Sequence, residues 1–199
     1  MKLDDWFFWV LSHTIGFAGA LLIGFLAIHL FSFIGNLLPE IIASGLGYIL
    51  WGGITGLSIG GIQWYFLRKY GISTGWIWKS FLGFALAETM GVLILLSMGI
   101  DRNIDLITSF GMEIWTLIYF TGGGITGWLQ STCLKKQGLK YQYWTLANAF
   151  IWGASTLLWT LLIKFRIGGN WIILLGGLSL GILSAVVLSF VLKERAPME

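Results

Sequence analysis

Charged residues are scarce in this chain of 199 residues: Asp, Glu, Lys and Arg make up 11% of it, whereas 57% is hydrophobic. A soluble domain of this length cannot bury so much apolar surface. The shortage of charge therefore indicates a protein of the lipid bilayer. The few basic residues form no stripe interleaved with aromatics, so we expect no nucleic-acid partner.

Cysteine is almost absent. Cys133 is alone in the sequence, which excludes an intrachain disulfide, a CxxC redox pair and a cysteine zinc site. The motifs HExxH and GxSxG are also missing, and no glycine cluster follows a strand to open a phosphate-binding helix. We therefore expect no enzyme and no metal centre, and the sequence identifies no cofactor.

Long apolar runs dominate what is present. Each supplies the roughly 20 residues that cross about 30 Å of hydrocarbon. They cover residues 7–33, 41–67, 76–99, 107–133, 144–164 and 170–192. The sequence predicts an all-α, polytopic membrane protein, with six transmembrane helices in one domain over residues 1–199. The first run should stay as a helix, because the residues before it make a poor signal-peptide n-region.

An internal repeat divides these runs into pairs. The segment 16–20 (GFAGA) returns 67 positions later at 83–87 (GFALA), and residues at 60–71 return at 127–138. A third, diverged copy contains GLSLG at 177–181, which resembles GLSIG at 56–60. We therefore expect three tandem hairpins, at about 6–72, 73–139 and 140–193, arranged around an axis along the membrane normal.

The basic residues predict the orientation. Nine Lys and Arg residues fall on one side of the predicted membrane and three on the other, which places both termini in the cytoplasm. The first side holds Lys2, Arg68, Lys69, Lys79, Lys135, Lys136, Lys140, Lys193 and Arg195; the second holds Arg102, Lys164 and Arg166.

The inner ends of the second and fourth runs share one pattern. It reads Gly56-x3-Gly60-x2-Gln63-Trp64-x2-Leu67-Arg68-Lys69 in the first copy and Gly123-x3-Gly127-x2-Gln130-x3-Leu134-Lys135-Lys136 in the second, where Ser131 replaces the tryptophan. This pattern resembles the hairpin ends of uncharacterised multi-pass membrane proteins of cyanobacteria and other bacteria. The resemblance implies a bacterial cytoplasmic (inner) membrane, or a thylakoid membrane in a cyanobacterium, and brings no activity with it.

Polar residues in the same region are candidates for a site. Gln63 and Gln130 lie on the helix face that carries glycines at four-residue spacing, a pattern typical of close helix packing. Each glutamine is expected either to hydrogen-bond a neighbouring helix or to bind a ligand. His13 and Asn148 lie at a similar predicted depth, so the four side chains can form one polar layer.

Glu88 and Glu113 are the strongest candidates for ligand binding, because a carboxylate inside a membrane span is costly and commonly functional. They lie equally far from the predicted turn at position 100.5 and so at about the same depth. If they meet, repulsion favours a shared proton or a bound cation. Neither has an acidic counterpart 67 residues earlier, which places a site between the third and fourth runs.

Tryptophan is abundant, and most of it is predicted to form interfacial belts. Those near the inner boundary are Trp6, Trp9, Trp64, Trp76, Trp78, Trp128 and Trp144, and Trp171 lies near the outer one. Four deeper tryptophans either fill space or line a cavity or a pigment site: Trp51, Trp115, Trp152 and Trp159.

Two functions remain open. The first is a transporter or a substrate-binding membrane component for a proton, a cation or a small cationic solute. The second is a non-catalytic accessory or assembly subunit of a larger membrane complex that binds pigment or lipid. The partners expected are the lipid bilayer and either other membrane subunits or further copies of the chain.

Overall fold

The computed structural model describes residues 3–34, 40–97, 112–167 and 170–192, and this part of the chain is all-α. Its six α-helices match the six predicted runs to within a few residues and confirm the all-α class. They are α1 (Leu3–Ile34), α2 (Glu40–Leu67), α3 (Gly75–Ser97), α5 (Met112–Lys136), α6 (Trp144–Lys164) and α7 (Asn170–Leu192), with a short 3-10 helix, η2 (Arg68–Tyr70), after α2.

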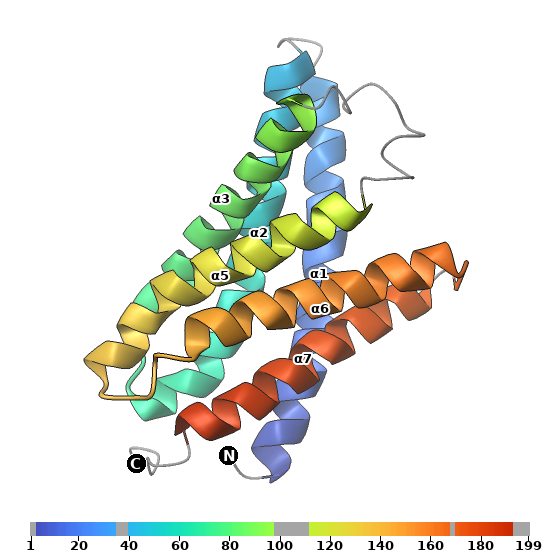
Figure 1. The fold of residues 1–199 in the computed structure, drawn as a ribbon. Coiled ribbons are helices and arrows are strands. Elements are labelled where there is room, and N and C mark those ends of the chain that lie inside the picture. Colours follow the sequence, from blue (N-terminus) through green and yellow to red (C-terminus); the bar gives the residue numbers. More distant parts are fainter. Residues whose placement is uncertain (1–2, 35–39, 98–111, 168–169, 193–199) are drawn as a thin grey trace.

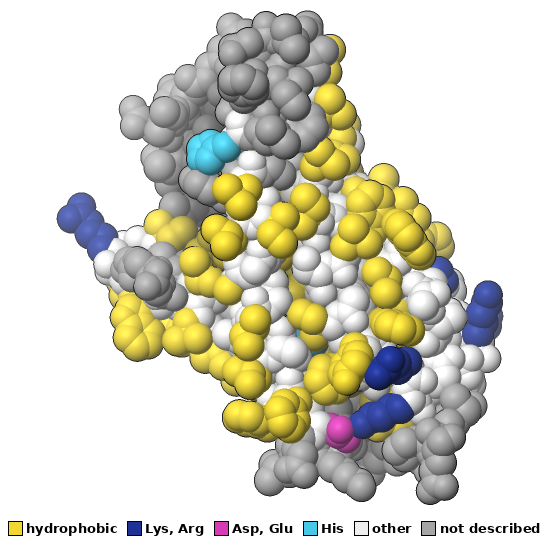
Figure 2. Space-filling model, turned by 180° about the vertical axis from the view of Figure 1, so that it is seen from behind, with side chains coloured by type: hydrophobic (Ala, Val, Ile, Leu, Met, Phe, Trp, Pro, Cys, Tyr) yellow, Lys and Arg dark blue, Asp and Glu magenta, His cyan; other side chains and the backbone are white. Residues whose placement is uncertain are grey.

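Five of the helices, α1, α2, α3, α6 and α7, are long and apolar enough to cross a membrane. Helix α5 is the least apolar of the six, since it contains several threonines and glycines and ends in two lysines. Figure 2 shows hydrophobic side chains over much of one face of the molecule, with Lys and Arg side chains toward its edges. Such an apolar exterior is typical of a protein that lipid surrounds.

The helices form a closed ring. Each one packs against its neighbour in the sequence, and α7 returns to pack against α1. In Figure 1, α5, α6 and α7 lie one beside the next and cross α1, α2 and α3 at a steep angle. The start of α1 and the end of α7 lie at the same end of the molecule.

Glycines end the second helix of each of the first two predicted hairpins. Gly71 and Gly138 have φ of 82° and 66°, in the left-handed region that favours glycine. The amide of Gly71 donates to the carbonyl of Arg68 at 2.9 Å, and that of Gly138 donates to Lys135 at 3.0 Å. Both turns reverse the chain at the end of the molecule where α1 begins and α7 ends.

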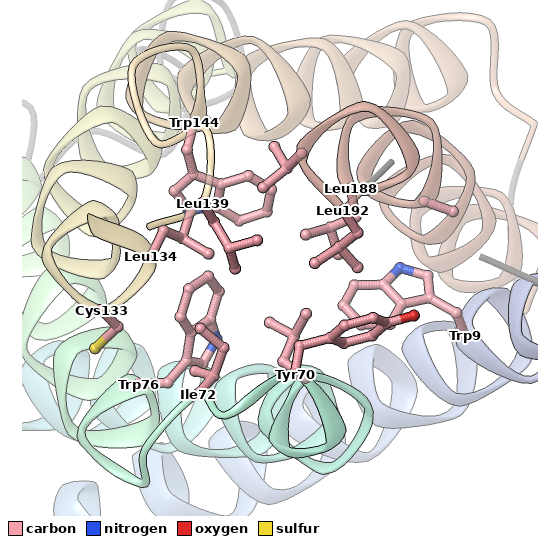
Figure 3. Close-up of a cluster of buried hydrophobic side chains, with 13 residues drawn as sticks. Trp9, Tyr70, Ile72, Trp76, Cys133, Leu134, Leu139, Trp144, Leu188 and Leu192 are labelled. Atoms are coloured by element: carbon pink, nitrogen blue, oxygen red, sulfur yellow. The ribbon is translucent and has the colours of Figure 1, made fainter. Parts of the chain in front are cut away.

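This end of the ring is filled by a hydrophobic core. Figure 3 shows its side chains pointing inward from helices around the ring. The core contains Trp9, Leu67, Tyr70, Ile72, Trp76, Cys133, Leu134, Leu139, Trp144, Ala185, Leu188, Val191 and Leu192. The tryptophans Trp9, Trp76 and Trp144 are completely buried, so their predicted place in a lipid-facing belt is wrong. By contrast, Trp78, Trp128 and Trp171 are exposed, as a belt requires.

Small residues allow close backbone contact between helices. A methyl group added at Gly123 on α5 would lie 2.7 Å from the carbonyl oxygen of Asn148 on α6. One added at Gly177 on α7 would lie 2.8 Å from Cα of Thr14 on α1. Neither separation leaves room for a larger side chain.

Candidate ligand-binding cavity

A cavity of about 270 Å³ lies between α2, α3, α5 and α6, toward the end of the ring opposite the filled core. It is far larger than the ~10–15 Å³ that a single water needs. The lining combines five aromatic side chains with one carboxyl, two hydroxyls and one aliphatic group: Tyr48, Trp51, Glu88, Trp115, Tyr119, Thr156, Trp159, Thr160 and Ile163.

Glu88 is the acidic residue among the described residues of this cavity, and only 2% of its surface is exposed. Helix α3 presents it beside Gly52 of α2, where an added methyl group would lie 2.6 Å from the carbonyl oxygen of Phe84. The same methyl group would touch the Glu88 side chain. The absence of a side chain at Gly52 therefore lets α2 and α3 approach and gives the glutamate stem its space.

The carboxyl of Glu88 has one hydrogen bond in the described part of the chain, which the hydroxyl of Tyr119 donates to Oε1 at 2.6 Å. None of the described residues that line the cavity is basic. Burying a carboxylate without a positive partner is costly. A proton or a positive charge beside it would neutralise this side chain.

Three aromatic rings of the cavity, those of Tyr48, Trp115 and Tyr119, belong to a row of ring contacts that continues beyond it. Ring centroids are 5.9 Å apart for Tyr48 and Trp115, and 6.0 Å apart for Trp115 and Tyr119. Tyr119 then stacks on Trp152, at 6.0 Å and 19° between the planes. Trp152 contacts Phe84 edge to face at 4.4 Å. The row joins α2, α5, α6 and α3 and fixes the orientation of the ring faces.

A second, smaller cavity of about 20 Å³ adjoins the first and shares Trp51, Tyr119, Thr156 and Trp159 with it. Two of its lining hydroxyls, Thr55 Oγ1 and Ser155 Oγ, are buried and make no hydrogen bond. The space is sufficient for one water, a candidate partner for these hydroxyls.

Gln63 and Gln130 lie outside this cavity and bind protein groups. Gln130 Nε2 donates to Gln63 Oε1 at 3.2 Å and to Ser80 Oγ at 2.8 Å. Gln63 Oε1 also accepts from the indole of Trp76 at 3.0 Å, and Gln130 Oε1 from that of Trp144 at 2.9 Å. These contacts are the interhelical hydrogen bonds expected as one alternative, and no described contact brings either glutamine to Glu88.

The other members of the predicted polar layer are buried but separate. Asn148 Nδ2 donates to the carbonyl of Gly123 at 2.7 Å. His13 stacks on Trp9 with ring centroids 4.4 Å apart, and its Nε2 has no hydrogen-bond partner. The layer is thus a set of local contacts between neighbouring helices.

The side chain of Glu113 lies outside the described residues, so its predicted pairing with Glu88 stays a prediction. Its position in α5 is six residues before Tyr119, the partner of Glu88. At about 1.5 Å per residue this is roughly 9 Å along the helix axis. In the described residues no group of three or more His, Cys, Asp and Glu side chains could hold a metal ion.

No family model, curated protein or solved structure matches this chain. The interpretation of the cavity therefore rests on its own geometry.

Five described lining residues did not emerge from the sequence: Tyr48, Tyr119, Thr156, Thr160 and Ile163. A comparison of the predicted copies contains a signal for one of them. Tyr119 stands 67 positions after Gly52, so it occupies the equivalent position of the second predicted copy. The first copy has no side chain there and the second has a large one. The deep tryptophans Trp51, Trp115 and Trp159 do line the cavity, as one of the two alternatives for them expected.

Proposed function

We propose that this chain is an integral membrane protein that binds a small cationic solute in the cavity beside Glu88, as a transporter or as the substrate-binding component of one. The observation that carries the proposal is the buried carboxyl in a space large enough for a ligand, with only a tyrosine hydroxyl as its hydrogen-bond partner in the described part of the chain. A carboxyl retained at such cost is commonly functional.

A purely structural role would explain these contacts less well. Structural carboxyls inside a membrane usually pair with a basic side chain or fill their hydrogen-bonding capacity, and a carboxylate has about four acceptor sites. Tyr119 occupies one of them. The remaining capacity belongs to a side chain that lines a cavity of about 270 Å³. A cation in the cavity would neutralise the charge of the carboxylate.

We also propose that six helices cross a bacterial cytoplasmic or thylakoid membrane as three tandem hairpins, with both termini cytoplasmic. Three equivalent contacts support the hairpins. The indoles of Trp9, Trp76 and Trp144, at spacings of 67 and 68 residues, each donate to a polar side chain near the end of a neighbouring helix. Helix α5 packs between α3 and α6, both apolar enough to span, which supports a sixth crossing.

The orientation is tested by cysteine labelling in a Cys133→Ala background. Arg102→Cys should react with an impermeant maleimide on intact cells, whereas Lys136→Cys should react only after permeabilisation. The reverse pattern would contradict the proposed orientation.

Binding is tested on the purified protein in nanodiscs, since Trp51, Trp115 and Trp159 line the cavity and their fluorescence reports occupancy. Inorganic and organic cations, together with proton uptake, are compared between the wild type and Glu88→Gln. Asp5→Asn is the matched control, because it also removes a carboxyl but one that pairs with Lys69 far from the cavity. The proposal expects Glu88→Gln to lose cation or proton binding and Asp5→Asn to keep it. Unchanged binding in Glu88→Gln, or its loss only through unfolding, would contradict the proposal.

A second candidate is a non-catalytic accessory subunit that binds pigment or lipid. The row of aromatic rings favours it, since aromatic side chains along a cavity can pack against the apolar surface of a pigment or a lipid. A coloured absorbance spectrum of the purified protein, or stable copurification with large membrane subunits, would support this alternative.

A further inference from the structure

We infer that the solute is an organic ammonium ion, held by the aromatic faces of the cavity together with the carboxyl of Glu88. This inference rests on the proposed cation site and names its substrate class. It is argued from three properties of the lining: its oxygen ligands, its ring faces and its size.

The described lining has few charged oxygen ligands for a dehydrated inorganic cation. Magnesium and calcium are held by several oxygen ligands, in which carboxylates take a leading part. The described residues offer one carboxyl, that of Glu88, and their other side-chain oxygens are the neutral hydroxyls of two tyrosines and two threonines.

The ring faces supply the attraction that the oxygens lack. Five of the nine lining residues are aromatic, three of them tryptophans. A cation within about 6 Å of a ring centroid is attracted by the negative face of the ring, most strongly by tryptophan. This attraction depends little on hydrogen-bond geometry, so it suits an alkylated ammonium group, whose charge is spread over its methyl and methylene groups.

The volume and the negative charge of the site agree with an organic ammonium ion as its ligand. A volume of about 270 Å³ is at the lower end of small-molecule pockets and far above that of a bare metal ion. None of the described lining residues is basic, so a solute with one positive charge would pair with the ionised carboxyl of Glu88 without competition from a described Lys or Arg side chain. A neutral solute of the same shape would gain no such charge pairing, and the carboxyl would need a proton instead.

The decisive experiment compares choline with its neutral isostere, 3,3-dimethylbutan-1-ol, by calorimetric titration of the nanodisc protein. Tetramethylammonium, sodium, potassium and magnesium are titrated in parallel. We expect choline and tetramethylammonium to bind, and the isostere to bind at least about tenfold more weakly. Glu88→Gln should weaken choline binding at least about tenfold while leaving the isostere unaffected.

Ring substitutions test the aromatic contribution. Trp115→Leu should weaken choline binding by about 3- to 30-fold, because it removes the ring. Trp115→Phe should have an affinity between those of Trp115→Leu and the wild type, because phenylalanine attracts a cation less strongly than tryptophan. Trp78→Leu is the matched control, since Trp78 is exposed outside the cavity. Thermal unfolding of each variant separates loss of affinity from loss of fold. Equal affinities for Trp115→Leu and the wild type would overturn the aromatic part of the inference.

The remaining outcomes separate this inference from the proposed function. Binding of inorganic ions or protons that depends on Glu88, without binding of either ammonium probe, would overturn the inference and leave the cation site in place. Isostere binding as tight as choline binding, unaffected by Glu88→Gln, would overturn both.

Discussion

Replacing Gln130 by leucine should destabilise the protein measurably, because it leaves a buried donor without an acceptor. Gln130 Oε1 accepts the indole N–H of Trp144, a residue that is completely buried. An indole nitrogen can only donate, so it has no alternative role. Two other side chains lose a hydrogen bond from Gln130 but keep another one. Gln63 still accepts from Trp76, and Ser80 still donates to the carbonyl of Trp76.

The expected cost is that of one unsatisfied buried group. Such a group costs about 1–3 kcal/mol, and side-chain hydrogen bonds between membrane helices reach about 1.7 kcal/mol. We therefore expect about 2 kcal/mol, which for a chain of this size lowers the melting temperature by about 4–8 °C. Gln63→Leu should lower the stability by a similar amount, because it leaves the buried indole N–H of Trp76 without its acceptor.

The chain supplies its own reporter for this assay. Cys133 is the single cysteine and is buried, so a thiol-reactive fluorophore reports unfolding without engineered labels. The double variant Gln130→Leu/Trp144→Phe removes donor and acceptor together, and its cost should fall below the sum of the single costs by about 1 kcal/mol. A melting temperature for Gln130→Leu within about 1 °C of the wild type, or strict additivity in the cycle, would refute the reasoning.

Three further predictions concern packing, a buried hydroxyl and the surface. Gly123→Val should lower the free energy of unfolding by at least about 2 kcal/mol, because its side chain would meet the α6 backbone. Gly61→Ala should not destabilise the protein, because the added methyl group would meet no packing atom of another residue within 4 Å. Thr126→Val should raise the melting temperature, because the buried hydroxyl of Thr126 has no partner and its removal ends a desolvation cost of about 1–3 kcal/mol. Asp5→Asn breaks the 2.7 Å ion pair with Lys69, yet should cost less than about 1 kcal/mol, because both side chains are partly exposed. All three are read by the same thiol-reactive melt, and a reversed order of Gly123→Val and Gly61→Ala would contradict the described packing.

The helices were predictable from the sequence because the length of an apolar run that can cross a membrane follows a simple rule. A span needs about 20 apolar residues, so the runs alone place the six helices to within a few residues. The turns were also encoded locally. Gly71 and Gly138 supply left-handed residues at matching positions of the repeated pattern.

The direction in which side chains face was harder to predict. Trp9, Trp76 and Trp144 lie at the depth of an interfacial belt, and depth alone predicted contact with lipid. The structure buries all three, because each finds an acceptor on an adjacent helix. Depth follows from position in an apolar run, whereas the facing direction depends on which helix is the neighbour.

Of the candidate site, only the charged residue could be predicted from the sequence. Glu88 stands out because carboxylates are rare in apolar runs. The rings around it do not stand out, since aromatics make up 16% of the chain and occur on every helix. Tyr48 and Tyr119 become meaningful only once α2 and α5 are placed on either side of α3.

The residues around Glu88 suggest how the predicted repeats could differ enough to produce the proposed site. At spacings of 67 and 68 residues, Glu88 corresponds to Leu21 and Thr156, and Gly52 corresponds to Tyr119. Glu88 packs against Gly52, which has no side chain, whereas the bulky Tyr119 reaches across to bind the carboxyl. The small residue at one position and the large one at its counterpart together open a cavity and direct a hydroxyl into it. If the copies had stayed identical here, neither the space nor the charge would occur at this level, so the proposed site is a product of their divergence.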